Sequence, residues 1–435
     1  MLVTDATLAG GDRRDVRVAD GRVAAVEASL EPDDGERVVD ADGALLLPGA
    51  VDVHVHFREP GFPHKETWTT GSRSAAAGGV TCVVDQPNTD PPTTTGPAFD
   101  VKARHARASL VDYGLNGGVS PDWDPAVLDR PLFALGEVFL ADSTGDMGID
   151  ADLFREALER AADAGVTVTV HAEDATLFDE GARERSDADA WSAYRTAEAE
   201  IAAVERALDV AADVGASIHV AHTSTPEAVD LVAETPGATC EVTPHHLLLS
   251  RDDLSELGTF GRMNPPLRSA ERRAALYERL VDGAVDVVAT DHAPHTREEK
   301  DAAIWEAPSG VPGVETMVPL LLARARDPSD PLTVERLRDA VARRPAERFD
   351  LPGKGRVEPG ADADLALYPA GARPVEGADL HSKCGWTPFE GQPGCFPAWT
   401  LLRGDPVYDP GGRFGDGTPT APFGSPVGTN VRTER

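Results

Sequence analysis

The stretch that decides the fold is VDVHVHFREPG, at residues 51–61. It places polar residues at alternate positions of an otherwise apolar run, which indicates a strand in the protein interior. His54, His56 and Arg58 are each two residues apart. Residues i and i+2 of a strand face the same side, so these side chains point into one space. This pattern predicts a functional site at the end of a buried strand.

Six further apolar runs with strand character follow between residues 79 and 293, with amphipathic helical segments between them. The runs are 79–86, 132–140, 166–172, 216–223, 238–244 and 285–293. Alternation of strands and helices over residues 50–354 predicts an α/β protein, specifically a (β/α)8 TIM-type barrel. A doubly wound open sheet is the alternative, but no GxGxxG fingerprint follows the first strand.

Both ends of the chain are rich in strand and turn signals instead. Residues 15–27 (DVRVADGRVAAVE) alternate around an Asp-Gly turn, and the chain after Arg356 is rich in glycine and proline. We therefore expect 1–49 and 355–435 to pair into one small composite domain, a β-sandwich beside the barrel.

The chain is strongly acidic, with 74 acids against 41 bases and a net charge of −33. The acids are dispersed through helical segments, and lysine is rare. This composition is typical of proteins from halophiles, whose surface repulsion is screened by molar salt. It argues against nucleic acid or an anionic membrane as a partner. Without a signal-peptide pattern, a membrane-length apolar run or paired cysteines, we expect a cytoplasmic protein with buried thiols.

Polar residues recur where the predicted strands end. They are His54, His56, His171, His222 and Asp291. The carboxyl ends of barrel strands meet on one face, so these side chains should gather there. Imidazole and carboxylate groups suit Zn²⁺ or a similar cation. Five ligands exceed the needs of one tetrahedral zinc, which predicts two metal ions with a bridging carboxylate.

One other histidine, His219, is a rival ligand, and two more, His245 and His246, are assigned no ligand role. His219 lies three residues before His222, on the opposite face of the strand and farther from its end, so His222 is preferred. His245 and His246 begin a loop or helix, where capping or contacts behind the ligands explain them better.

Several motifs together carry a family resemblance that spans nearly the whole chain. They are HFREPG (56–61), QPNT (86–89), MNPPLR (263–268) and DHAPH (291–295). On these motifs the sequence resembles the amidohydrolase superfamily and, within it, the dihydroorotases. The resemblance implies zinc-dependent, reversible ring closure of N-carbamoyl-L-aspartate to L-dihydroorotate plus water, in pyrimidine synthesis.

The resemblance also assigns roles to individual residues. Arg58, Asn88 and His295 match the positions that bind the substrate carboxylate, and Asn264 matches a ring-contacting asparagine. Asp291 would take a proton from the attacking water and pass it to the leaving nitrogen, while the metal ions activate that water.

One position departs from the family pattern. Many relatives bridge their metals with a carboxylated lysine, but residues 132–140 (LFALGEVFL) contain none. Glu137 stands in its place and could bridge the metals without carbon dioxide, so no carboxylated lysine is expected. Asp142, in the following loop, is the competitor. A single fully occupied metal site is the other arrangement that remains open.

Two other functions remain as alternatives. An allantoinase or dihydropyrimidinase would share the metal ligands, but Arg58 and Asn88 argue against it. A catalytically silent partner of another enzyme would be expected to lose metal ligands, and all five are present here. The oligomeric state is left open, with a homodimer as one arrangement.

Overall fold

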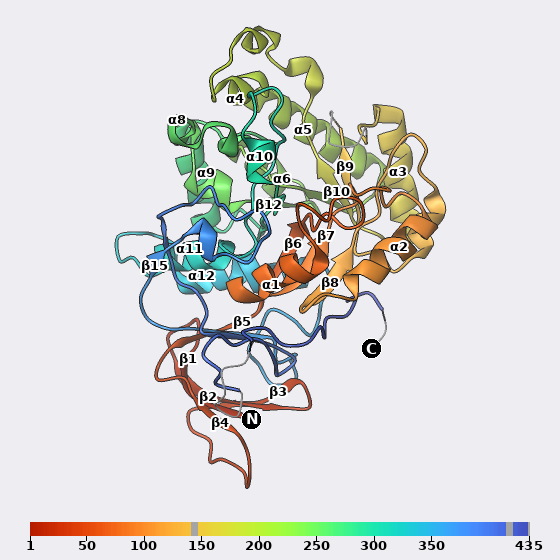
Figure 1. Cartoon of the computed structure of the whole chain (residues 1–435). Helices are drawn as coiled ribbons and strands as arrows, with labels where there is room; N and C mark the ends of the chain where they lie inside the picture. The colour runs from red at the N-terminus through yellow and green to blue at the C-terminus, as the bar shows by residue number, and fades with distance from the viewer. Residues whose placement is uncertain (141–146, 415–420, 434–435) are drawn as a thin grey trace.

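Strands from both chain ends gather beneath an α/β part formed by the middle of the chain (Figure 1). The structure is a computed structural model, and it describes residues 1–140, 147–414 and 421–433. The mixed α/β class predicted from the sequence is confirmed.

Short parallel strands occupy the centre of the α/β part. Their bounds are β6 Ala50–Val55, β7 Val80–Asp85, β8 Asp112–Leu115, β9 Leu135–Phe139, β10 Val168–His171, β11 Ile218–Val220, β12 Thr239–Val242 and β13 Val287–Val288. β6, β7 and β8 form one parallel sheet, and β9 to β13 form another. Isolated parallel bridges join the two sheets, between Gly117 and Leu135 and between Val55 and His292.

Each predicted strand contains an observed one, but β8 was not predicted. Its sequence, Asp-Tyr-Gly-Leu, has a charged residue and a glycine where an apolar pattern is expected. Asp112 is tolerated there because it is paired with Lys354 and Arg403, which lie far along the chain.

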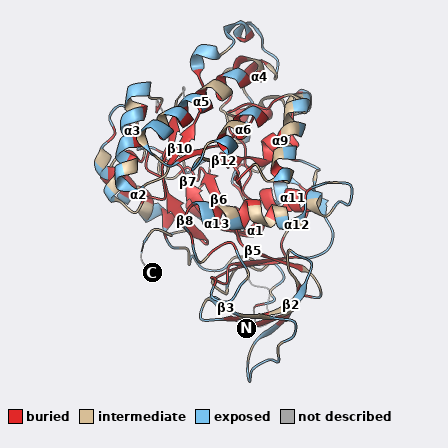
Figure 2. Cartoon of the chain, turned by 180° about the vertical axis from the view of Figure 1, so that it is seen from behind, coloured by how far each residue is buried: buried red, intermediate tan, exposed pale blue. Residues whose placement is uncertain are grey.

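Helices cover the outside of these strands. The main ones are α1 Trp68–Gly78, α2 Gly96–Ala106, α3 Ala151–Ala164, α5 Ala197–Val214, α6 Pro226–Glu234, α9 Ala270–Asp282, α11 Met317–Ala325, α12 Val334–Arg338 and α13 Arg344–Arg348. Further short helices are α4 Ala190–Tyr194, α7 Pro244–Leu248, α8 Leu254–Leu257 and α10 Arg297–Lys300. Figure 2 shows the strands buried and the outer helix faces exposed. Local signals set the boundaries; α5, for example, begins after the Thr196 cap and ends at left-handed Gly215.

The chain ends share one eight-stranded sheet. Its strands are β1 Leu2–Thr7, β2 Arg13–Ala19, β3 Arg22–Glu27, β4 Val38–Asp40, β5 Leu45–Pro48, β14 Leu365–Tyr368, β17 Trp399–Leu402 and β18 Asp405–Tyr408. β5 and β14 pair side by side, which joins the two ends of the chain. A two-strand ribbon of β15 Arg373–Pro374 and β16 Pro393–Gly394 lies apart from this sheet. The two-layer sandwich and the boundaries 1–49, 50–354 and 355–435 stay predictions.

The end sheet packs closely on helix α1. Gly79, which ends α1 with φ of 84°, leaves no room for a side chain, because a Cβ would lie 1.9 Å from Tyr368 Oη on β14. Thr400 Oγ1 on β17 donates a 2.7 Å hydrogen bond to the carbonyl of Ala76. The first strand with functional residues, β6, follows directly from β5, so this sheet anchors the base of the site. Within the described residues, no helix is both long and apolar enough to span a bilayer.

Candidate metal centre

Polar side chains from successive strand ends line one cavity at the carboxyl end of the parallel strands. Its walls include His56, Arg58, Asn88, Glu137, His171, His222, Asn264 and Asp291. Most of the residues that the sequence marked as functional are therefore brought together.

One group of possible ligands comes from the first and last strands of the α/β part. His54, His56 and Asp291 each place a ligand atom within 4.8 Å of the others. His56 Nε2 lies 2.9 Å from Asp291 Oδ1, and His54 Nε2 lies 3.5 Å from the same oxygen. All three residues are buried.

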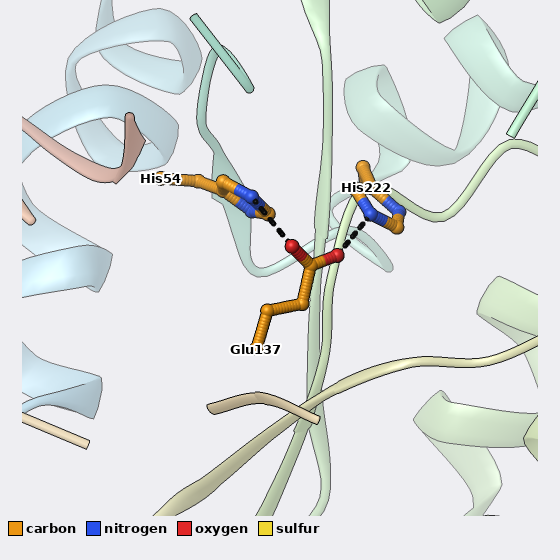
Figure 3. A group of neighbouring side chains, drawn as sticks. All are labelled: His54, Glu137 and His222. Atoms are coloured by element: carbon orange, nitrogen blue, oxygen red, sulfur yellow. Dashed lines mark hydrogen bonds and ion pairs between the residues drawn. The ribbon is translucent and has the colours of Figure 1, made fainter. Parts of the chain in front are cut away.

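A second group shares His54 and centres on Glu137, from β9. Figure 3 shows the Glu137 carboxylate between the rings of His54 and His222. Glu137 Oε1 lies 2.5 Å from His222 Nε2 and 3.1 Å from His171 Nδ1, while Oε2 lies 3.4 Å from His54 Nε2. One carboxylate thus contacts histidines from three other strand ends. This is where a carboxylate shared between two metal ions would stand.

The donor atoms fit a divalent cation. His54 Nε2 and His222 Nδ1 are buried without a hydrogen-bond partner among the described residues. An unpaired buried imidazole nitrogen is costly, and a cation held by His54 Nε2 and the neighbouring carboxylates would satisfy that nitrogen. Imidazole and carboxylate are the ligands of catalytic zinc sites.

Glu241, on β12, holds the ligand shared by both groups, and the sequence analysis did not single it out. Its Oε1 lies 2.5 Å from His54 Nδ1 and accepts a 3.2 Å hydrogen bond from the backbone N–H of His222. Its Oε2 pairs with His219 Nε2 at 3.2 Å. His219 Nδ1 contacts Thr239 Oγ1, so both ring nitrogens of His219 have partners outside the candidate ligand groups. The sequence feature that could have identified Glu241 is that it is the lone acid within the apolar run ATCEVTP.

A buried ion pair holds His171 in a similar way. His171 Nε2 lies 2.7 Å from Glu173 Oε2, and Arg195 Nε donates to both oxygens of Glu173 at 3.0 and 3.1 Å. Glu173 and Arg195 were also missed, since an acid two residues after a histidine has no distinctive pattern. A carboxylate on one imidazole nitrogen fixes the ring orientation and raises the basicity of the other.

The local field keeps the carboxylates ionised. Burial alone would raise the pKa of Asp291. The hydrogen bond from His56 and the charges of the nearby histidines outweigh burial and lower this pKa to about 2. Burial likewise raises the pKa of Glu137, and His222 and His54 lower it well below its ordinary value. Both groups are therefore ionised at neutral pH and can accept a proton or bind a cation.

Arg58 lies beside this centre as a buried cation. Burial lowers its pKa, and it forms no ion pair with any described carboxylate. Its Nη2 lies 3.2 Å from His295 Nε2. His295 is not part of the cavity wall. It lies behind Arg58, where Nε2 reaches the Ser309 carbonyl at 3.0 Å and Nδ1 contacts Lys65 Nζ at 3.1 Å.

The two asparagines lie on the cavity wall, and each also contacts a second residue. Asn88 Oδ1 lies 2.7 Å from His56 Nδ1, and Asn264 Oδ1 accepts a 3.0 Å hydrogen bond from Trp191 Nε1. His246 contacts Thr243 Oγ1 through one ring nitrogen and the carbonyl of Pro265, 19 residues further along the chain, through the other. Asp142, the competitor of Glu137, lies outside the described residues.

The site can now be set beside known proteins. The model of the amidohydrolase family matches residues 45–376. A dihydroorotase of Halobacterium salinarum is 65% identical over 412 residues, covering 94% of this chain and 96% of the relative. A dihydroorotase of Methanosarcina acetivorans is 42% identical, covering 91% and 88%. An allantoinase of Rubrobacter xylanophilus is 36% identical, covering 98% and 95%.

Solved structures agree with this grouping. An L-hydantoinase (dihydropyrimidinase) from Arthrobacter aurescens matches with a TM-score of 0.90 at 29% identity, covering 98% of both chains. The chain therefore belongs to the amidohydrolase family and, by its identity to the relatives above, to the dihydroorotases within it.

Proposed function

We propose that this chain interconverts L-dihydroorotate and N-carbamoyl-L-aspartate. The observation that carries the proposal is Arg58, a buried guanidinium that lines the same cavity as the metal ligands without a carboxylate of its own. A buried charge without a direct ion pair is costly, and a carboxylate on the substrate would pair with it. Dihydroorotate has such a group on its ring; dihydrouracil and allantoin do not. The dihydroorotase relatives support the same choice.

The proposed cofactor is a pair of zinc ions with Glu137 as the bridging ligand. His54, His56 and Asp291 would hold one ion, and His171 and His222 the other. No lysine competes for the bridging role within the described residues, because each ammonium group has other contacts. Lys102 pairs with Asp85 at 2.6 Å, and Lys65 lies beside His295 and Glu299. This favours a bridge that needs no carboxylated lysine.

Asp291 is the proposed proton carrier. In ring opening its carboxylate takes a proton from the attacking water and delivers it to the leaving ring nitrogen; ring closure reverses these transfers. Its low pKa keeps it ionised at neutral pH, and His56 Nε2, 2.9 Å from Asp291 Oδ1, places the carboxylate beside the proposed ion. When bound, the zinc ions would lower the pKa of water and polarise the ring carbonyl. Arg58 fixes the substrate carboxylate, and thereby the ring, beside them.

The proposed scaffold is a closed (β/α)8 barrel. Two observations support closure: parallel pairing runs from β6 to β8 and from β9 to β13, and isolated bridges link the two sheets at both margins. The homodimer, the cytoplasmic location and the lack of nucleic-acid or membrane partners stay predictions from the sequence.

The test is substrate choice by the zinc-loaded protein in multimolar KCl. Ring opening is measured for L-dihydroorotate, dihydrouracil and allantoin, for the wild type and for Arg58→Met. We expect the wild type to open dihydroorotate alone and Arg58→Met to lose most of that activity. Turnover only of rings without a carboxylate would replace this proposal with the allantoinase or dihydropyrimidinase alternative. A protein that binds no zinc and opens none of the three would favour a silent partner.

A further inference from the structure

A tryptophan outside the metal centre determines which way the amide of Asn264 faces. Trp191 lies on α4, near the top of Figure 1, and is largely buried. Its indole Nε1 donates to Asn264 Oδ1 at 3.0 Å and to the Met263 carbonyl at 3.1 Å. The two residues come from different parts of the chain, 73 positions apart.

The indole N–H is only a donor, which resolves the orientation of the amide. The atom that faces Trp191 must be the carbonyl oxygen of Asn264, because its NH2 group cannot accept a hydrogen bond. The NH2 group then lies on the other side. Asn264 Nδ2 makes no hydrogen bond to any described residue, and Asn264 lines the cavity that holds the metal ligands.

The surroundings keep Trp191 in place. The guanidinium carbon of Arg262 lies 3.7 Å from the centre of a Trp191 ring, within the range of a cation–π contact. Trp305 also packs against Trp191, with ring centres 5.7 Å apart at 64°. Arg262 Nε also reaches Ser309 Oγ at 3.2 Å, next to the cavity wall. A tryptophan packed in this way has little freedom to turn its N–H elsewhere.

We propose that Trp191 is a positioning residue that commits Asn264 to donate hydrogen bonds, so that Asn264 recognises a carbonyl oxygen of the substrate ring. This inference rests on the proposed function, because it takes the ring amide of dihydroorotate as the ligand. Arg58 would bind the carboxylate of the substrate, and Asn264 would donate a hydrogen bond to a carbonyl oxygen of the ring. Two fixed polar contacts on different atoms define how the ring lies against the metal centre.

Trp191→Phe tests the proposal, since it keeps an aromatic ring and removes the N–H. The amide of Asn264 could then rotate, and we expect KM for L-dihydroorotate to rise about three- to tenfold, the usual effect of one lost hydrogen bond. The matched control is Trp305→Phe. Trp305 belongs to the same aromatic cluster, but its N–H donates to the Arg185 carbonyl, so KM should stay within about twofold of wild type. Zinc content is measured for every variant.

A double-mutant cycle separates positioning from general packing. If Trp191 acts through Asn264, then Trp191→Phe should have little further effect on KM once Asn264→Ala is present. Independent effects that multiply, an unchanged KM in Trp191→Phe, or an equal loss in Trp305→Phe would each overturn the inference. A wild type without activity on dihydroorotate would overturn the proposed function and the inference together; the other outcomes leave the proposed function intact.

Discussion

Glu137 Oε1 lies 2.5 Å from His222 Nε2, although the two residues are 85 positions apart in the chain. Glu137 is on β9 and His222 follows β11, so β10 lies between them. The same carboxylate reaches His171, at the end of β10, and His54, on β6. A single acid therefore connects four strand ends. A bridging ligand between two cations requires this central position.

Replacing Glu137 should remove part of the metal. We expect Glu137→Gln to reduce zinc from about two ions per chain to about one or none, because an amide is a poor bridging ligand. Ring opening should fall by at least about a hundredfold. The measurement is zinc content by elemental analysis after dialysis, with dihydroorotate turnover alongside.

Asp142→Asn is the matched control for Glu137→Gln. It neutralises the competing acid, which follows β9 in the sequence, and should leave both zinc ions and the activity in place. If Asp142→Asn loses zinc while Glu137→Gln keeps it, the bridging role belongs to Asp142.

Glu241 should set metal affinity without touching metal or substrate. Its carboxylate holds His54 through Nδ1, so that Nε2 faces the metal centre. Neutralising it in Glu241→Gln should weaken zinc binding by about ten- to a hundredfold, the usual effect of losing such a contact. Competition against a chelator measures this affinity directly.

Thr239→Val provides the comparison for Glu241→Gln. Thr239 contacts His219, which also pairs with Glu241, but it does not contact His54. Its loss should leave zinc affinity near that of wild type. Equal weakening in both variants would mean that the whole buried cluster, rather than the hold on His54, determines affinity.

The histidines that the structure brings together at the cavity could be singled out from the sequence because each ends an apolar run, where a polar residue is conspicuous. Glu241 was missed although it is buried in a strand, because its role in holding histidines depends on two residues that only the fold brings beside it. Trp191 could not be predicted at all. A tryptophan in a short helix is ordinary, and its contact with Asn264 depends on how α4 sits above the strand ends. Sequence periodicity predicts where strands end, but it does not predict which side chains from distant segments pack over those ends.

The alternation of strands and helices could also be predicted from the sequence. Both faces of these strands are buried, so the strands appear as nearly continuous apolar runs. Strand β8 was missed because its Asp112 depends on Lys354 and Arg403, which are distant in sequence. Lys354 Nζ lies 2.8 Å from Asp112 and 2.6 Å from Asp364 on β14. This buried cluster links the α/β part to the end sheet.

Removing Lys354 should destabilise the protein strongly. Lys354→Met leaves buried carboxylates without their shared cation, which costs about 3–5 kcal/mol in comparable cases. The exposed pair of Arg155 and Asp213, at 2.6 Å, is the control. Arg155→Met should cost less than about 1 kcal/mol. Denaturant unfolding in high salt measures both, and equal losses would contradict the assigned role of the buried cluster.

The effect of Lys354→Met should depend on pH. Burial raises the pKa of Asp112, but Lys354 and Arg403 outweigh it and hold it at about 2, below its ordinary value of 3.8. A depressed carboxyl pKa adds stability above about pH 4 that is lost as the pH falls towards 2. The difference in unfolding free energy between wild type and Lys354→Met should therefore narrow below about pH 4. A difference that stays constant down to pH 2 would contradict this pairing.

Salt should stabilise the folded chain. With a net charge of −33, the surface repels itself until counterions screen it. The Debye length falls from about 10 Å at 0.1 M to about 3 Å at 1 M, so most of the rise in Tm should occur below about 1 M KCl. Thermal unfolding across a KCl series tests this. A Tm that does not change over that range would remove the electrostatic explanation of the acidic composition.

The most direct test of the metal centre is anomalous X-ray scattering at the zinc edge from crystals of the zinc-loaded protein. The account predicts two peaks, one held by His54, His56 and Asp291 and the other by His171 and His222. Glu137 should lie between the peaks with one oxygen towards each. A single peak, or two peaks with Glu137 turned away from them, would contradict the proposal that this carboxylate replaces a carboxylated lysine.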